Sequence, residues 1–181
     1  PTDFGTLVQR DHVDLQKELG HLLDPVATPT VLNDALDGVR LGLTAHAEAE
    51  DIVLGRFASI TEVAPLIGRA RAAHLAQEGA LAALVSARPG TTAWRDRAMH
   101  LRDLVRYHAE QEERELLPAL RNHAPTELYA KLAGAFATER LRQLSMLQPS
   151  APLYFDTPRT EVMRAEVVRT DATRLAARLA L

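Results

Sequence analysis

Two copies of one histidine and glutamate pattern occur in this chain at a constant offset. Shifting the sequence by 62 residues places His12 on His74, and residues 46–51 on residues 108–113. Each of the two segments begins with a histidine and has a glutamate four positions later. Internal similarity of this kind indicates two copies of one structural unit that pack against each other. The repeat therefore favours a fold built from two equivalent halves.

Each copy has the spacing of a helical hairpin, with one histidine on its first helix and a His-x-x-x-Glu on its second. Residues four apart on an α-helix share a face, so His46 and Glu50 can both point inward, as can His108 and Glu112. At 1.5 Å per residue, the first helix runs about 16 Å beyond its histidine and the second returns about 24 Å. The loop takes up the difference, so we expect the ligand residues of all four helices at one level of a bundle.

The residue types in this pattern suit a metal site. Carboxylates and imidazoles together bind iron, manganese or zinc, and inward carboxylates can each bridge a pair of ions. Burying two carboxylates without compensation is very costly, and metal charge compensates them. The expected ligands are His12, His46, Glu50, His74, His108 and Glu112. Taken alone, each histidine also fits a core or surface residue, and a purely structural bundle is the alternative.

The rest of the chain has the pattern of helices separated by breaks rich in Pro, Gly and Thr. The expected helices cover about residues 3–23, 30–57, 62–86, 93–122, 126–147 and 160–181. No sustained alternation and no hairpin dipeptide favours strands. We expect an all-α fold, with a four-helix bundle over residues 1–123 and a C-terminal two-helix extension over residues 124–181.

The composition excludes several classes of site and partner. The chain has no cysteine, which excludes disulfides, thiolate metal sites and cysteine nucleophiles. A net charge of −3 gives no reason to expect nucleic acid or an anionic membrane as a partner. No apolar run approaches the roughly 20 residues of a membrane span, and the N-terminus lacks the features of a signal peptide. The expected location is the cytoplasm.

Together these residues resemble the hemerythrin-like proteins, also called HHE cation-binding proteins. The resemblance covers roughly residues 4–122 and rests on residues 11–12, residues 46–51, His74 and residues 108–118. The last of these segments is similar to the fourth helix of the family, in which a His-x-x-x-Glu-Glu runs into Leu-Leu-Pro.

The resemblance implies an up-down bundle with a non-haem di-iron centre. Glu50 and Glu112 would bridge the two iron ions, together with an oxo, hydroxo or water bridge, and the four histidines would complete the ligand set. Members of this family bind or sense dioxygen or iron, or turn over peroxide and other small oxidants. Manganese and zinc suit the same residue types, so iron rests on the resemblance.

Two positions differ from the oxygen-carrying hemerythrins. Their fifth histidine is replaced by Glu78, and their fourth-helix aspartate is replaced by Glu112, which follows His108 one position sooner. A carboxylate-richer ligand set favours oxidative chemistry over reversible oxygen carriage. Glu78 lies on one helical line with His74 and Leu81, so we expect it to face inward as an additional metal ligand.

The other polar residues near the pattern have simpler interpretations. His21, His100 and His123 have no repeat partner and are expected at the surface or at helix ends. Tyr107 is expected on a helix surface. The acidic residues that flank the motifs are expected to be solvated or to support ligand histidines: Glu48, Asp51, Glu110, Glu113 and Glu115. The Glu-x-x-His spacing of ferritin-like sites occurs once, at residues 18–21, and that architecture needs it twice.

Three functions are compatible with the predicted metal-binding bundle. The first is reaction with dioxygen or peroxide, in the sensing, scavenging or breakdown of an oxidant, which includes peroxidase-like or catalase-like chemistry. The second is a di-iron oxidase or oxygenase that acts on a small organic substrate. The third is a non-catalytic metal-binding or oligomerisation module. We expect the helix over residues 160–181 to dock on its own bundle or across a dimer, so a monomer or a homodimer is expected.

Overall fold

The structure, a computed structural model, describes residues 2–147, and these residues confirm the all-α fold. The helices are α1 Phe4–His21, α2 Pro29–Leu54, α3 Ala64–Val85, α4 Thr92–Gln111, α5 Leu117–His123 and α6 Thr126–Leu147, with short 3-10 and π segments at Gly55–Phe57 and Glu112–Leu116. Each lies close to its expected range. The linker and the helix expected after residue 147 lie outside the described residues. Among the described helices, none is long and apolar enough to cross a membrane.

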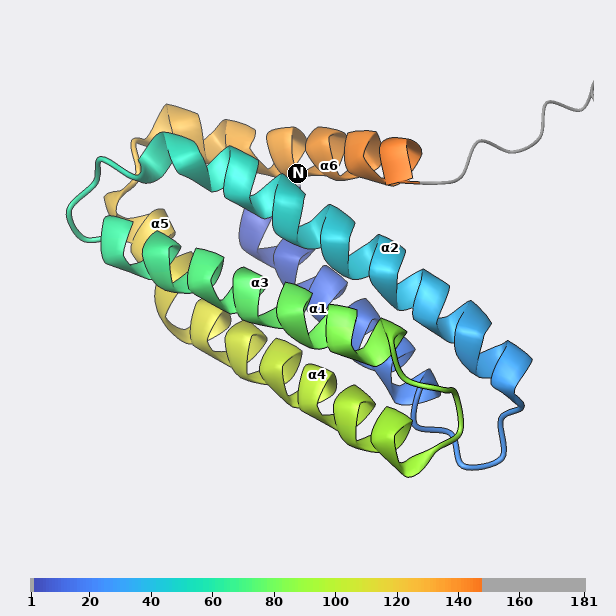
Figure 1. Ribbon diagram of the computed structural model, residues 1–181. Coiled ribbons are helices and arrows are strands. Elements are labelled where there is room, and N and C mark those ends of the chain that lie inside the picture. Colours follow the sequence, from blue (N-terminus) through green and yellow to red (C-terminus); the bar gives the residue numbers. More distant parts are fainter. Residues whose placement is uncertain (1, 148–181) are drawn as a thin grey trace, which may run out of the picture. The chain divides into compact units, whose positions relative to one another are not determined.

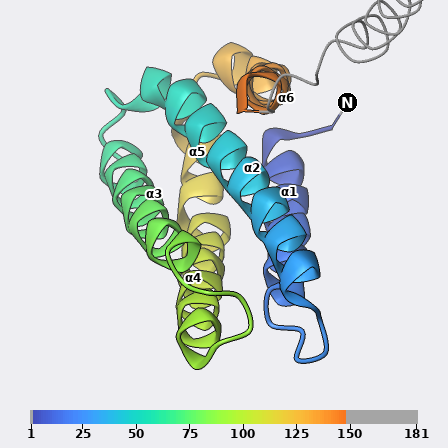
Figure 2. The ribbon, with the colours of Figure 1, turned by 45° about the vertical axis from the view of Figure 1, so that its right-hand side comes forward.

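The first four helices form an up-down bundle (Figure 1). Helix α1 contacts α2 and α4, and α3 contacts α4 and α2, so the four close into a ring. Helix α6 packs on α2 and α1 and crosses them near the N-terminal end of the chain (Figure 2). The division into domains at residue 123 stays a prediction.

Short side-chain contacts define where two of the long helices begin. The hydroxyl of Thr28 accepts a hydrogen bond from the backbone N–H of Val31, and Pro29 occupies the first position of α2. The hydroxyl of Thr91 accepts from the N–H of Trp94 in the same way at the start of α4. Gly90 has a φ of 79°, which other residues rarely adopt, and allows the turn that leads into this cap.

The apolar core is divided into two clusters, one on either side of a polar layer. Along α1, Phe4 and Val8 belong to one cluster and Leu15 and Leu19 to the other, and His12 lies between them. Along α2 the same order is reversed, because the helix runs antiparallel to α1. The buried polar residues therefore lie mid-way along the bundle, with apolar side chains at both ends that exclude water.

The fourth bundle helix contains one π turn, at Glu112–Leu116. The backbone N–H of Leu117 donates to the carbonyl of Glu112, five positions earlier. Pro118 follows directly; it has no N–H, and its ring crowds the carbonyl of Arg114, so a regular α-helical turn is disfavoured there. π turns occur often at functional sites. This one begins at Glu112 and so sets the position of that carboxylate in the bundle.

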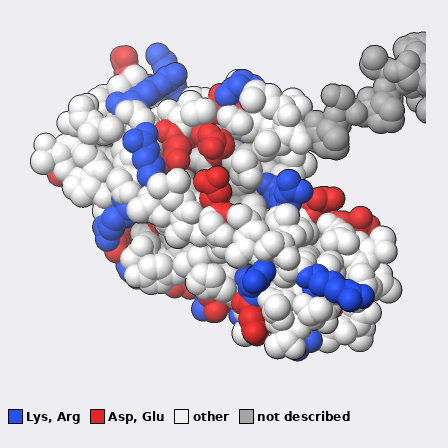
Figure 3. All heavy atoms as spheres, in the orientation of Figure 1, with Lys and Arg blue, Asp and Glu red and all other residues white. Residues whose placement is uncertain are grey.

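Acidic side chains gather on one face of the molecule. Figure 3 shows a few of them close together over α2 and its boundary with α3, with basic side chains beside them.

Candidate metal centre

The six expected ligand residues meet in the polar layer of the bundle. Each has at most 6% of its surface exposed. They come from all four bundle helices and from the π turn: His12, His46, Glu50, His74, His108 and Glu112. The structure therefore brings together, from positions as far as a hundred residues apart, the side chains that the repeat pairs.

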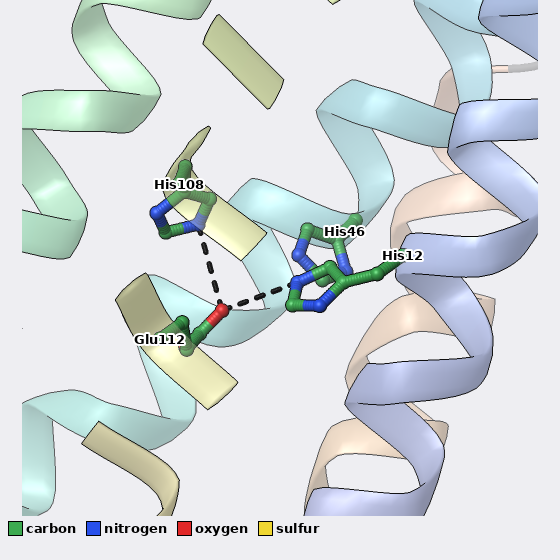
Figure 4. Close-up of side chains that lie close together, drawn as sticks. All are labelled: His12, His46, His108 and Glu112. Atoms are coloured by element: carbon green, nitrogen blue, oxygen red, sulfur yellow. Dashed lines mark ion pairs between the residues drawn. The ribbon is translucent and has the colours of Figure 1, made fainter. Parts of the chain in front are cut away.

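Two carboxylates lie at the centre of this cluster. Oε2 of Glu112 lies 3.2 Å from Nε2 of His12 and 3.5 Å from Nε2 of His108 (Figure 4). Oε2 of Glu50 lies 3.2 Å from Nε2 of His74 and 3.7 Å from Nε2 of His46 on the same helix. Nε2 of His74 and Nε2 of His108 are 3.1 Å apart. The coordinating atoms of four helices thus converge on one small volume.

The donors divide into two overlapping groups of four. One contains His12, His46, His108 and Glu112, and the other contains His46, Glu50, His74 and His108. Within each group, one donor atom of every residue lies within 4.8 Å of those of the others, and all of these residues are buried. A compact set of buried nitrogen and oxygen donors is the arrangement that holds a metal cation. The two groups share His46 and His108.

Several of these atoms lack a hydrogen-bond partner within the described residues. They are the Nε2 atoms of His12 and His46 and both carboxylate oxygens of Glu50 and of Glu112. The contacts at 3.2 to 3.9 Å are close approaches without the alignment of a hydrogen bond. Buried polar atoms without a partner are costly. A cation among them would satisfy nitrogen lone pairs and carboxylate oxygens together, so the residues fit a metal.

The two hairpins support each other's histidines in a reciprocal way. Nδ1 of His12 donates to Oε1 of Glu113 at 2.8 Å, and Nδ1 of His74 donates to Oδ1 of Asp51 at 3.1 Å. The 62-residue offset relates the two histidines to each other and the two acids to each other. Each acid fixes the ring of the opposite hairpin and directs its Nε2 toward the cluster. Of the flanking acids, Asp51 and Glu113 contact histidines of the cluster, and the expectation that these histidines are metal ligands stays a prediction.

A third supported histidine breaks the repeat symmetry. Nδ1 of His46 donates to Oδ2 of Asp11 at 3.3 Å, and the same oxygen accepts from Nε of Arg140 on α6. The position equivalent to Asp11 in the second hairpin is Ala73. The side chain of Ala73 cannot accept a hydrogen bond, so it offers no such support to His108. The second hairpin is therefore less constrained on that side of the site.

Helix α6 also packs against the cluster through an aromatic ring. The ring of Phe136 lies edge-on to the imidazole of His46, with centroids 5.9 Å apart, and edge-on to Phe4 at 5.6 Å. Sequence reasoning missed both Phe136 and Arg140, because no local pattern relates residues of α6 to a motif in α2.

The carboxylates raise the pKa of two of the histidines. Burial by itself lowers the pKa of His12, but Glu112 and Glu113 overcome this effect and raise it to about 9. Burial by itself also lowers the pKa of His74, but Asp51 and Glu50 overcome this effect and raise it to about 10. Negative charge from the buried carboxylates therefore dominates the environment of both rings.

For His46, His108 and Glu50, burial decides the direction of the pKa shift. Burial lowers the pKa of His46, although the hydrogen bond that His46 donates to Asp11 opposes this effect, and burial lowers the pKa of His108 to about 4. Burial, with the neighbouring Glu112 second, raises the pKa of Glu50 well above its usual range. In such a cluster, protons compensate buried charge, and a bound cation would replace them.

A small cavity reaches the cluster beside His108 and Glu112. It has a volume of about 20 Å³ and lies between α3 and the π turn, where His108 and Glu112 form part of its wall. Leu66, Ala70 and Leu116 supply apolar atoms to the same wall. A cavity of this size holds about one water molecule.

The expectation that Glu78 faces inward is wrong. Its side chain is exposed, and it lies outside both donor groups. The buried face of α3 runs through Ala70, His74 and Gln77, so the inward position after the histidine is three residues on, not four. Gln77 is 2% exposed and occupies that place. An amide at this position carries no motif, and only its apolar neighbours at helical spacing could have indicated its burial.

The remaining histidines and Tyr107 are at the surface, as expected. His21, His100 and His123 are exposed. Tyr107 is 61% exposed and accepts a hydrogen bond from Gln111 on the same helix.

The chain matches one known protein family over most of the described residues. The model of the hemerythrin HHE cation binding domain matches residues 4–120. The matched range contains all six residues of the cluster and ends before α6 begins. No match was found among curated proteins or among solved structures.

Proposed function

Because this chain belongs to the hemerythrin HHE cation-binding family, we propose that its cluster holds two iron ions and reacts with dioxygen or peroxide. The family and the buried donor groups support binding of a metal cation. The identity of the metal, the presence of two ions and the reaction with an oxidant are the parts that we propose.

The contacts of the two glutamates support a pair of ions. Glu50 lies 3.7 Å from His46 of its own hairpin and 3.2 Å from His74 of the other. Glu112 likewise contacts one histidine from each hairpin. A carboxylate placed between histidines of two halves is suited to bridge one ion held by each half. In this assignment each half supplies two imidazoles, and Glu78 is not a ligand.

The small cavity beside His108 and Glu112 is the observation that favours a small oxidant. Its volume of about 20 Å³ admits a molecule of the size of water, dioxygen or peroxide. When bound, two iron ions would supply the redox equivalents and the Lewis acidity for such chemistry. The residues of the chain hold the imidazoles in fixed orientations, exclude bulk water with two apolar clusters, and leave room for a small molecule beside His108 and Glu112.

A variant that fills this cavity tests the proposal. Leu66→Trp should slow the reaction of the iron-loaded protein with hydrogen peroxide, followed by optical absorbance, while metal content stays unchanged. Leu141→Trp is the matched control, because Leu141 is exposed on α6 and lines neither this cavity nor the pocket beside His74. If wild-type protein with two bound iron ions shows no spectral change with dioxygen or peroxide, the proposed reaction is wrong. Equal rates in both variants and wild type would contradict this entry route.

An oxidase or oxygenase acting on an organic molecule is the second candidate. The observation that favours it is a larger pocket, of about 160 Å³, between α2 and α3, which has His74 in its wall. Product analysis after reaction with dioxygen in the presence of candidate substrates would distinguish it from the first: incorporation of oxygen into an organic product supports an oxygenase, and an oxidised product without that incorporation an oxidase.

A further inference from the structure

The pocket between α2 and α3 has a chemistry of its own. It has a volume of about 160 Å³, and Leu43, Leu75 and Leu81 form apolar parts of its wall. About 10–15 Å³ of such volume holds one water molecule, so this pocket has room for a short organic molecule. Neither Glu50 nor Glu112 lines it. It is therefore a separate feature that adjoins the metal cluster through His74.

Gln77 in the wall of this pocket has an unsatisfied side chain. It is 2% exposed, and neither Oε1 nor Nε2 has a hydrogen-bond partner within the described residues. Leaving both ends of a buried amide unpaired is unfavourable, and native structures contain few such groups. A molecule in the pocket could pair with both atoms, since the amide offers one acceptor and two donors.

The charge of the lining selects the kind of molecule. Glu48, Asp51 and Glu78 line the pocket, and no Lys or Arg does so among the described residues. Asp51 is already engaged, because it accepts from His74 and lies 3.9 Å from Arg71. Glu48 and Glu78 are exposed and make no ion pair with another described residue. Anions are disfavoured here, and a cation would gain two carboxylate neighbours.

We propose that this pocket binds a short aliphatic amine that carries a hydroxyl or carbonyl oxygen. Its protonated amine would face Glu48 and Glu78, and its oxygen would accept from the amide of Gln77. Its alkyl part would contact Leu43 and Leu81. The proposal does not depend on the identity of the metal or on its reaction with an oxidant, because the groups that would bind the amine lie outside the donor groups.

Ligand-observed NMR and calorimetry with the purified 181-residue chain test the ligand class. The probes are 4-aminobutan-1-ol, butan-1-ol and 4-hydroxybutyrate, which have similar size and differ in charge. The amino alcohol should bind at least about tenfold more tightly than the neutral alcohol, and the anion should bind more weakly still. Equal binding of the three, or no binding of the amino alcohol at millimolar concentration, would overturn the proposal.

Two variants locate the binding site. Gln77→Leu should weaken binding of 4-aminobutan-1-ol by about tenfold or more while the melting temperature stays equal or rises, because an apolar side chain removes the unpaired amide. Glu78→Gln should weaken it by a smaller factor and reduce its salt dependence. Unchanged affinity in both variants contradicts the site. A large loss of stability in Gln77→Leu would show instead that the amide serves the fold, and would also contradict it.

Matched controls separate these effects from general ones. Gln16→Leu replaces another glutamine with an unpaired buried nitrogen, on α1 and outside the pocket. Glu110→Gln removes one exposed carboxylate on α4. Both should leave the affinity for the amino alcohol unchanged. Metal content measured on every sample shows whether a failure of amine binding coincides with loss of metal, which distinguishes this proposal from the one for the metal centre.

Discussion

Arg140 on α6 donates a hydrogen bond to Asp11 on α1, across 129 positions of the chain. The oxygen of Asp11 that accepts it also accepts from Nδ1 of His46. Burial would raise the pKa of Asp11, but the hydrogen bond and charge of His46, followed by those of Arg140, hold it below its usual range. The carboxylate therefore stays ionised beside the ring. A helix outside the range of the family match thus helps to orient a residue of the buried histidine and glutamate cluster.

Asp11→Asn should lower the affinity for metal by about 10- to 100-fold, because the partner that orients a ligand histidine and raises its basicity is weakened. Competition with a chelator of known affinity measures the effect. Asp14→Asn, on the exposed side of the same helix, is the control. Arg140→Lys should be milder than Arg140→Ala. Unchanged affinity in Asp11→Asn would show that His46 is oriented by other contacts.

Phe136→Ala should destabilise the protein by about 3–5 kcal/mol, as expected for truncation of a buried aromatic side chain. Phe136 is 2% exposed and packs on Phe4 and His46. Urea denaturation measures the free energy of unfolding. Leu141→Ala on the same helix, where the side chain is 64% exposed, should change it by less than about 0.5 kcal/mol. Similar values for the two variants would contradict the packing of α6 on the bundle.

Asp51→Asn and Glu113→Gln should weaken metal binding by similar factors, about tenfold each, because the repeat gives the two acids equivalent roles. Asp51 holds His74 and Glu113 holds His12, each in the opposite hairpin. The exposed neighbour Glu110, replaced by Gln, should have no effect. An effect confined to one of the two acids would mean that the halves contribute unequally to the site.

Addition of ferrous iron without oxygen should raise the melting temperature, because a metal that binds only the folded state stabilises it. Iron at 100 times its dissociation constant would contribute about 2.7 kcal/mol for each site. Glu50→Gln should abolish most of this increase, since it removes a carboxylate shared by both halves. A variant that gains the same stability from iron as the wild type would exclude Glu50 from the ligand set.

The central part of this architecture could be predicted from the sequence because it follows from local regularities. Helical spacing of apolar residues located the helices, and the 62-residue offset paired His12 with His74 and Glu50 with Glu112. Burial follows from the same pattern, because these residues continue the apolar faces of their helices. The six residues of the cluster could therefore be grouped from the sequence alone.

The parts that could not be predicted depend on tertiary packing or on small changes of helical phase. Arg140 and Phe136 approach His46 only because α6 folds back over α2. Gln77 rather than Glu78 is buried because the inward face of α3 advances by three residues after His74. Positions three and four residues after His74 both lie about one helical turn away. The sequence alone therefore could not decide whether Gln77 or Glu78 is buried.

The π turn at Glu112–Leu116 lies between these cases. Pro118 is a visible signal that the regular hydrogen bonding of the helix is interrupted. A proline inside a helix can produce a kink, a break or a π turn, and packing of Leu116 and Leu117 into the core favours the π turn here.

Titration of the metal-free protein with ferrous iron under anaerobic conditions tests whether the cluster holds two iron ions. Bound iron is separated from free iron and counted per chain, with Glu112→Gln as a ligand variant and His100→Ala, at the surface, as a control. We expect two tightly bound ions in the wild type and in His100→Ala, and fewer than two in Glu112→Gln. Saturation at one ion, or no binding, in the wild type would contradict a two-iron centre.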